Sequence, residues 1–358
     1  MKGYKKLIAV IILLITILGT GCSNSSSLNE NEPTIGFVAY EFNNTWITEL
    51  KNEVYKVSKG KARVDIWNGD NSQTTESNKI NLFINRKVKA LVVNPVDVNA
   101  AGQIIEKSKK ANIPIVFVNR EPKKEDIEKW NKVYYVGAKA EQSGTIQGQI
   151  LANYFKDHPT QDGTIRYIML KGETGNQDTE ERTKYSIKAL EDSGFKVQKV
   201  AEDTAMWDRT KAQEKMTSFI SSYGQNFDCV IANNDDMALG AVDALKAAGY
   251  FNGGKYVPVV GVDATAPAVK AVEDGTLLGT VLNDAAKQGD AVFDLSYVLS
   301  NGKTPDESNF KYKITDGKYV WIDYKMITKE NVQDAIVNNS DIPNEKNEAA
   351  ISAASGST

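Results

Sequence analysis

The stretch "KGETGNQDTEERTKY" brings Asn176, Asp178 and Arg182 together between an apolar run and a helix-like pattern. Arg182 shares one helical stripe with Tyr185 and Leu190, at spacings of three and eight, so we expect it to point inward. A buried guanidinium needs acceptors for its five donors, and Asp178 can supply only part of them. Ligand oxygens would supply the rest. The alternative is a surface ion pair between Asp178 and Arg182 that contributes little.

Polar side chains also follow seven apolar runs that are typical of strands. They are Tyr40, Asn94, Asn119, Lys171, Asn234, Asp263 and Asn283. The carboxyl ends of parallel strands form the edge at which open α/β sheets bind ligands. Amides and carboxylates suit a ligand rich in hydroxyl groups, and no Walker-type or G-x-G-x-x-G pattern favours a phosphorylated one. The alternative is that these side chains only cap the helices that follow.

Two tryptophans lie near such strand ends. Trp46 follows the first strand in "NNTWITEL", and Trp207 follows a later one in "DTAMWDRT". Because the apolar face of a sugar ring stacks on aromatic rings, one tryptophan from each half of the chain could enclose a pyranose. Trp67, Trp130 and Trp321 are interpreted as structural.

The elements that must position these residues alternate along the chain. Ten strand-like runs are read: "TIGFVAY", "RVDIW", "ALVVN", "PIVFVN", "VYYVG", "TIRYIML", "KVQKVAE", "CVIANN", "VPVVGVD" and "LLGTVLN". Each is expected to precede ten or more helical residues, and no tight hairpin joins any pair, which predicts parallel sheets in an α/β fold. The 358 residues suffice for two domains, and a weak internal similarity suggests two alike halves.

The net charge of -3 and pI near 5.6 offer no basic face for nucleic acid. "MKGYKK" and the apolar run after it are typical of an export signal, residues 1–21, and "GTGC" places Cys22 where a bacterial lipoprotein is acylated. An ordinary secretory signal or an uncleaved anchor is the alternative. Residues 22–33 would form a flexible tether, and residues 341–358 a disordered tail. Cys229 is expected to be a small buried hydrophobic residue.

The motifs "VNPVD", "VNREP", "YYVG", "LKGETG", "DTAMWD", "ANNDDMALGAV", "GVDA" and "GTVLND" occur in this order in the chain. Over about residues 34 to 335 the chain resembles the bacterial galactose- and glucose-binding proteins, a family of type I periplasmic binding proteins that deliver sugar to ABC transporters.

The resemblance implies two Rossmann-like lobes with parallel sheets, residues 34–137 plus 286–320 and residues 138–285 plus 321–340. Three hinge segments would join them, near 137–140, 283–286 and 319–322. It implies sugar contacts by Asp263 and Asn283, with further bonds from Asn119, Asp178, Arg182 and Asn234, rings from Trp46 and Trp207, and Tyr40 in the cleft.

Three site positions depart from the family pattern. Asn44 replaces an aspartate, Asn176 a histidine and Trp46 a phenylalanine. Asn44 would keep an acceptor and add donors, and Asn176 could still donate to a hydroxyl group.

The family's calcium loop is also degenerate. Its positions are occupied by His158, Thr160, Asp162, Thr164, Arg166 and Asp228. A hard cation prefers carboxylates and carbonyls, which this set has mostly lost. We expect Arg166 to pair with Asp162 or Asp228 in place of the ion, so that no metal and no cofactor are bound.

These expectations describe an extracytoplasmic, monomeric, non-enzymatic lipoprotein on the outer face of the cell membrane. It would bind galactose or glucose and deliver it to an ABC permease by hinge closure, with a chemoreceptor as a further partner. The alternatives are another monosaccharide, a purely sensory component, a carbohydrate-active enzyme using the cleft carboxylates, or a sugar-responsive repressor. A repressor would begin with a helix-turn-helix rather than an export signal.

Overall fold

The computed structural model describes residues 32–251, 253 and 255–335. The predicted leader (1–21), Cys22, most of the tether (22–33), the end of the second lobe (336–340) and the tail (341–358) lie outside the described residues. Within the described ranges, no helix is both long and apolar enough to cross a lipid bilayer.

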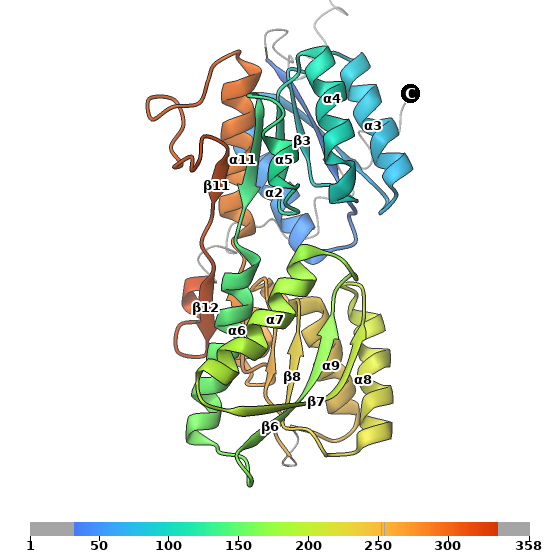
Figure 1. The fold of residues 1–358 in the computed structure, drawn as a ribbon, viewed down its shortest axis with the longest axis vertical. Helices are drawn as coiled ribbons and strands as arrows, with labels where there is room; N and C mark the ends of the chain where they lie inside the picture. The colour runs from blue at the N-terminus through green and yellow to red at the C-terminus, as the bar shows by residue number, and fades with distance from the viewer. Residues whose placement is uncertain (1–31, 252, 254, 336–358) are drawn as a thin grey trace, which may run out of the picture. The chain divides into compact units, whose positions relative to one another are not determined.

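The first lobe is built on a parallel sheet with the strand order β11-β5-β4-β3-β1-β2. Its strands are β1 (Thr34–Ala39), β2 (Arg63–Asn68), β3 (Ala90–Val93), β4 (Ile115–Val118), β5 (Val133–Gly137) and β11 (Tyr319–Trp321). Its helices are α2 (Thr45–Ser58), α3 (Gln73–Asn85), the 3₁₀ turn η1 (Val98–Ala100), α4 (Ala101–Ala111), α5 (Lys124–Ile127) and α11 (Ala285–Ser300). Although α11 comes late in the sequence, it packs on α2 and on this sheet (Figure 1).

The second lobe is built on a sheet with the order β12-β10-β9-β8-β6-β7. Its strands are β6 (Thr164–Lys171), β7 (Lys196–Thr204), β8 (Cys229–Ala232), β9 (Val259–Val260), β10 (Gly279–Leu282) and β12 (Lys325–Thr328). Its helices are α6 (Ala140–Asp157), α7 (Gln177–Asp192), α8 (Arg209–Tyr223), α9 (Asp235–Ala247) and α10 (Ala266–Glu273).

The two sheets share one topology. When the strands of each sheet are numbered along the chain, both sheets have the spatial order second, first, third, fourth and fifth, followed by one strand from late in the sequence. The predicted α/β fold with two alike halves is therefore confirmed. The late strand β12 differs from the expectation, since it pairs antiparallel to β10. It enters its sheet from the neighbouring lobe, so it is not tied to the direction that a βαβ crossover imposes.

The chain passes between the lobes three times. The crossings lie between β5 and α6, between β10 and α11, and between β11 and β12. Two of them fall at the expected segments 137–140 and 283–286. The third expected segment, 319–322, overlaps β11, because Tyr319–Trp321 pairs with β5 before the chain crosses.

Two helices are shorter than expected. After β4, α5 has only four residues, and after β9, α10 has eight, so the expectation of ten or more helical residues after every strand was wrong at these two places. Pro122 follows β4 closely and disfavours helical backbone in the residue before it, which keeps this connection extended.

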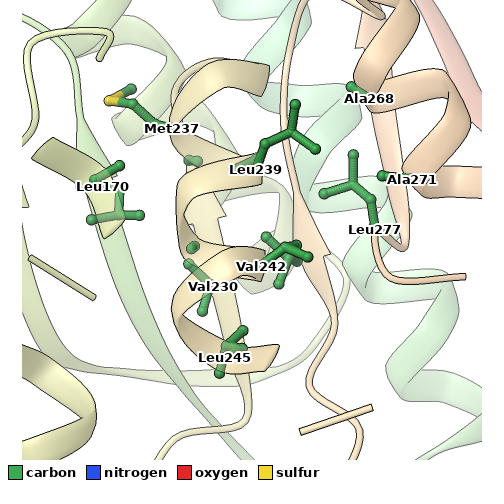
Figure 2. Close-up of a cluster of buried hydrophobic side chains, with 14 of the residues drawn as sticks. Leu170, Val230, Met237, Leu239, Val242, Leu245, Ala268, Ala271 and Leu277 are labelled. Carbon is green, nitrogen blue, oxygen red and sulfur yellow. The ribbon is translucent and has the colours of Figure 1, made fainter. Parts of the chain in front are cut away.

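Apolar side chains fill the spaces between sheets and helices. Figure 2 shows the core beside α9, where Met237, Leu239, Val242 and Leu245 pack with residues from β6, β8 and α10. Cys229 on β8 is fully buried, as expected for a small hydrophobic residue.

Helices α6 and α7 lie side by side at very short range (Figure 1). A Cβ atom at Gly148 would lie 2.4 Å from the Ser186 carbonyl oxygen, and one at Gly144 would lie 2.7 Å from that of Arg182. Only glycine permits this approach. The close packing fixes α7, and with it the position of Arg182.

Candidate functional site

A cavity lies between the carboxyl ends of the two sheets and holds about 360 Å³ of space between protein atoms, part of it open to solvent. We call it the inner cavity. Its lining residues are Tyr40, Asn44, Trp46, Ile47, Asn119, Arg120, Asn176, Asp178, Arg182, Trp207, Asn234, Asp263 and Asn283. All eleven residues expected to contact a sugar are in this set, and Ile47 and Arg120 are the additions. Their individual roles remain predictions.

Arg182 is the buried cation of the inner cavity, with 3% of its surface exposed. Its Nη1 donates to the Asn233 carbonyl oxygen at 2.8 Å, and its Nη2 donates to the Tyr324 hydroxyl at 3.1 Å and lies 3.4 Å from Asp178. This burial excludes the surface ion pair that was the alternative. The Nε of Arg182 is buried and has no hydrogen-bond partner in the described chain, so one donor of this guanidinium is unsatisfied there.

The charged groups inside the cavity shift one another's pKa values. Burial opposes the charge of Arg182, but Asp178, Tyr324 and Asp263 more than offset this and hold its pKa above the ordinary value. Burial raises the pKa of the Asp263 carboxyl well above its usual range; Arg182 opposes the shift, and the nearby Asp235 adds to it. The Asp263 carboxyl group is therefore costly to keep ionised unless hydrogen-bond donors reach it.

Asp263 and Asn283 form a connected pair at the ends of neighbouring segments of the second sheet. The Asn283 Nδ2 donates to Asp263 Oδ1 at 3.2 Å, and the Gln288 Nε2 donates to Asn283 Oδ1 at 2.7 Å. Asp263 has a positive φ of 131°, a backbone conformation that side chains rarely adopt. Strained backbone of this kind is concentrated at functional sites.

Three asparagines of the cavity are also helix N-caps. The Oδ1 atoms of Asn44, Asn176 and Asn234 accept the backbone N–H groups of the first turns of α2, α7 and α9. Capping and lining therefore coexist at these positions. The Asn44 oxygen accepts the Ile47 N–H at 3.0 Å, which uses one of its two lone pairs, so the expectation that Asn44 keeps an acceptor for a ligand stays a prediction. Its amide nitrogen remains as the donor.

Asn119 also lines the cavity and also has its side-chain oxygen engaged within the protein, but it does not cap a helix. Its Oδ1 accepts the Asn94 Nδ2 at 3.1 Å, and its backbone is left-handed with φ 63°. Asn94 is fully buried and does not line the cavity, and neither does Lys171. Of the seven strand-end residues, five reach the inner cavity, and Asn94 instead positions one of them.

The two tryptophans come from different lobes. Trp46, in the first turn of α2, donates its Nε1 to the Asn283 carbonyl oxygen of the second lobe at 2.6 Å. Trp207, between β7 and α8, packs over Gly172, where a Cβ atom would lie 2.1 Å from the ring. The other three tryptophans pack against the core of the first lobe and do not line the inner cavity.

Arg120 is the polar lining residue that was not predicted from the sequence. Its guanidinium carbon lies 3.8 Å from the Tyr40 ring centroid, and its Nη1 donates to the Val96 carbonyl oxygen at 2.9 Å. Its Nη2 lies 3.1 Å from Glu173 of the second lobe. The only available signal was its place directly after Asn119 in "VNREP", at a strand end.

Polar contacts join the lobes around the cavity. The Thr45 hydroxyl donates to Asp236 at 3.0 Å, and the Gln177 Nε2 donates to Glu121 at 3.4 Å. Together with the Trp46 and Arg120 contacts, they hold the strand ends of both sheets against one space. The arrangement can surround a small ligand on two sides.

The loop that the resemblance matches to a calcium loop holds an ion pair. The Nη1 and Nη2 atoms of Arg166 both contact the Asp162 carboxylate, and Nη1 lies 3.8 Å from Asp228, which confirms the expected pairing. The hydrogen bonds from Arg166 lower the pKa of Asp162 to about 2. His158 instead stacks on Tyr154, with ring centroids 4.3 Å apart. Among the described residues, no group of three or more histidine, cysteine, aspartate or glutamate side chains is placed to hold a metal ion.

Residues 35–304 match the family described as periplasmic binding protein domain. The chain is 36% identical over 333 residues to the D-galactose/methyl-galactoside binding periplasmic protein of Haemophilus influenzae, covering 91% of this chain and 98% of that protein. It is 29% identical over 323 residues to the xylitol-binding protein of Mycolicibacterium smegmatis, covering 90% and 84%. An ABC transporter solute-binding protein of Bacillus halodurans, solved with bound myo-inositol, superposes with a TM-score of 0.73 at 27% identity, covering 86% and 98%.

Proposed function

Because the chain belongs to the periplasmic binding protein family, whose members bind substrates and are not enzymes, we propose that it is the extracytoplasmic solute-binding component of an ABC transporter. The solute is an uncharged monosaccharide, D-galactose or D-glucose. The observation that carries this proposal is the inner cavity itself, in which amide, carboxylate and guanidinium groups from both lobes face one space beside two tryptophans.

The chemistry of the inner cavity favours a neutral polyol. A sugar hydroxyl donates one hydrogen bond and accepts two, so it needs more donors than acceptors around it. The cavity offers such donors, because the oxygens of Asn44, Asn119 and Asn176 each accept a hydrogen bond within the protein while their nitrogens donate none within the described chain. Asp178 and Asp263 supply the acceptors. Trp46 and Trp207 supply apolar surface for the ring faces.

The ligands named for the relatives support this class. Galactose and methyl-galactoside, xylitol and myo-inositol are all uncharged and rich in hydroxyl groups. They differ in skeleton and in the arrangement of those groups, because xylitol is an open chain whereas galactose and myo-inositol form six-membered rings, so another monosaccharide is the alternative to a hexose. The identity to the galactose-binding relative, 36%, favours galactose or glucose.

We propose that the lobes close on the ligand by bending at the three crossings. In an open form the strand-end groups would be hydrated, and the sugar would replace that water before both lobes contact it. Micromolar binding requires about 8 kcal/mol, and hydrogen bonds to charged groups such as Arg182 contribute roughly 1.5–3 kcal/mol each. A few such contacts are enough.

Calorimetric titration of the purified protein with galactose, glucose, ribose, xylose and arabinose tests the function. We expect saturable binding of galactose or glucose with one site per chain. Tighter binding of a pentose would replace the hexose by another monosaccharide. Absence of binding to all five sugars would refute the proposal.

We also propose that Cys22 carries the lipid anchor that holds the protein at the outer face of the membrane. The support is the sequence "GTGC" after the apolar leader. Cell fractionation of a Cys22→Ser variant should find the protein released into the medium. Its full retention in the membrane fraction would contradict the anchor.

A further inference from the structure

The amino ends of the first lobe's parallel strands carry an excess of positive charge. The segment that leads into β2 reads "KGKAR" (59–63), the turn before β3 reads "RKVK" (86–89), and the last turn of α4 contains "KK" (109–110). Every lysine and arginine in these three segments is exposed. We call the three segments the basic edge. Because the inner cavity lies at the carboxyl ends of the strands, the basic edge is at the opposite end of this sheet.

Much of this charge is not neutralised within the described chain. Arg63 lies 3.0 Å from Asp65. By contrast, Lys59, Lys87 and Lys89 have no carboxylate within salt-bridge distance among the described residues. The expectation that the chain offers no basic face was therefore wrong at this edge. The net charge of -3 is an average over two unlike lobes, so it conceals a local excess of cations.

The stabilisation of helix ends by cations does not account for the basic edge. Lysine and arginine are favourable near the carboxyl end of any helix. The second lobe has the same topology, and its turns before β8 and β10 correspond to those before β3 and β5. These turns read "GQNFD" (224–228) and "DGTLL" (274–278), so each contains an acid and neither contains a lysine or arginine. The positive charge is therefore a property of the first lobe and not of the fold.

The chain enters the first lobe in the middle of the basic edge. Strand β1 lies between β2 and β3 in the sheet. At its start, the Arg63 N–H donates to the Pro33 carbonyl oxygen at 3.0 Å, and the Lys89 N–H donates to the Thr34 carbonyl oxygen at 2.7 Å. The first residues of β1 are therefore flanked on both sides by cationic segments.

The proposed lipid anchor would keep this edge close to the membrane. Only residues 23–32 separate Cys22 from Pro33. A chain of this length spans at most about 40 Å even when it is fully extended. Attraction between a basic segment and anionic lipid acts within about one Debye length, roughly 8 Å at physiological salt, and the anchor would bring the basic edge repeatedly into this range.

Two exposed apolar side chains accompany the basic edge. Leu82, in the last turn of α3, is 49% exposed and precedes Arg86 by four residues, and Tyr55 on α2 is 38% exposed and precedes Lys59 by four residues. Within the described part of the first lobe, no other large hydrophobic side chain is this exposed. At a membrane interface, such side chains lie at the level of the lipid headgroups beside the stems of lysine and arginine.

We infer that the basic edge is a membrane-docking surface, at which lysine and arginine contact the phosphate groups of anionic phospholipids and Leu82 and Tyr55 lie among the headgroups. This inference rests on the proposed extracytoplasmic location and on the lipid anchor at Cys22. It goes beyond both by assigning the first lobe a second, reversible contact with the bilayer. Phospholipid is favoured over nucleic acid because a protein at the outer face of the membrane meets the lipid surface first.

The test is co-sedimentation of the purified Cys22→Ser protein, on which no acyl chain can contribute, with lipid vesicles. One set contains phosphatidylcholine alone, and the other contains equal amounts of phosphatidylcholine and phosphatidylglycerol. At low salt we expect at least about tenfold stronger binding to the anionic vesicles, and high salt should abolish the difference. Equal binding to both sets, or binding to neither, would overturn the inference. The anchor would be unaffected, because membrane retention of the wild-type protein tests it separately.

A Lys59→Glu/Lys89→Glu variant locates the contact and should bind the anionic vesicles at least about tenfold more weakly. The matched control is Lys196→Glu/Lys246→Glu, which makes the same change in net charge at exposed residues on the corresponding edge of the second lobe and should bind like the parent protein. Thermal unfolding of both variants checks that they remain folded. An equal loss in the two variants would overturn the inference. So would tighter binding to soluble polyglutamate than to the vesicles, which would assign the basic edge to an acidic polypeptide.

Discussion

Arg182 is the residue around which the polar groups of the inner cavity are arranged. Its guanidinium joins Asp178 on its own helix, Asn233 at the end of β8 and Tyr324 at the third crossing. These contacts fix the guanidinium plane before any ligand arrives, so the unpartnered Nε–H is pre-organised. Little conformational entropy would be lost if a ligand oxygen accepted a hydrogen bond from this guanidinium.

Replacing Arg182 with lysine should therefore weaken sugar binding. An ammonium group keeps the charge but cannot reproduce the planar fork that reaches Asn233, Tyr324 and Asp178 at once. We expect about 1.5–3 kcal/mol of binding free energy to be lost, or roughly tenfold to a hundredfold in affinity, measured by calorimetry.

The control for this change is Arg209→Lys, which alters an exposed pair with Asp243 outside the inner cavity and should leave affinity unchanged. Thermal unfolding of both variants separates loss of binding from loss of fold. A folded Arg182→Lys protein with wild-type affinity would show that the guanidinium does not contact the ligand.

The gathering of the eleven predicted residues at one cavity could be predicted from sequence, because strand ends and helix starts of parallel α/β units meet at one edge. The direction of each amide could not. Asn44 and Asn119 have the same side chain, yet the Asn44 oxygen accepts an N–H at the start of a helix and the Asn119 oxygen accepts the Asn94 Nδ2. Arg120 was missed because its side chain crosses to Glu173 of the other lobe, a contact that no local spacing predicts.

At the scale of elements, the long apolar runs predicted the buried strands, since a strand covered on both faces is continuously apolar. The short late strands β11 and β12 were not among the ten predicted. They have three and four residues, and their place is set by pairing with β5 and β10 rather than by their own pattern. Such tertiary dependence outweighs strand propensity.

The loop before β6 is held by an ion pair and hydrogen bonds rather than by a metal ion. Asp162 accepts the Thr164 N–H at 3.0 Å, and Asp228 accepts the Arg166 N–H at 2.8 Å, while the Arg166 guanidinium lies near both carboxylates. The guanidinium charge therefore lies near two carboxylates that the resemblance assigns to a cation site.

We expect no calcium binding at this loop. Calorimetric titration of chelator-treated protein with calcium should give no saturable heat in the micromolar range, and the thermal midpoint should be the same with calcium and with chelator. An Asp162→Asn variant identifies the location if heat is observed. Micromolar binding that is lost in this variant would contradict the expectation.

At the scale of the whole molecule, the contact between the lobes brings acidic groups together. Glu49 on α2 of the first lobe faces Asp235 and Asp236 at the start of α9 in the second lobe. Burial, with the charge of Asp235 next, raises the pKa of Glu49 to about 8, while the Ala266 N–H at the start of α10 opposes the shift. The hydrogen bond from Thr45 to Asp236 lies at the same contact.

Closure should therefore take up a proton. In a form with separated lobes, Glu49 would be hydrated and would titrate near the ordinary glutamate pKa of about 4.3. The closed form, with a pKa of about 8, binds this proton more tightly, so the free energy of closure becomes less favourable as pH rises from about 4.3 to about 8. Asp235 is hydrogen-bonded by Thr265 and Thr280 of its own lobe, so its titration largely cancels between the two forms.

Sugar affinity, which depends on closure, should thus fall as pH is raised within this window. Calorimetric titrations from pH 6 to 8 should show a loss of affinity, of which Glu49 accounts for up to about tenfold per pH unit, the limit for one proton. A Glu49→Gln variant keeps the shape of the side chain but cannot ionise, so its affinity should vary much less with pH. An affinity that rises with pH in the wild-type protein, or a Glu49→Gln variant with the wild-type slope, would show that this contact does not control closure.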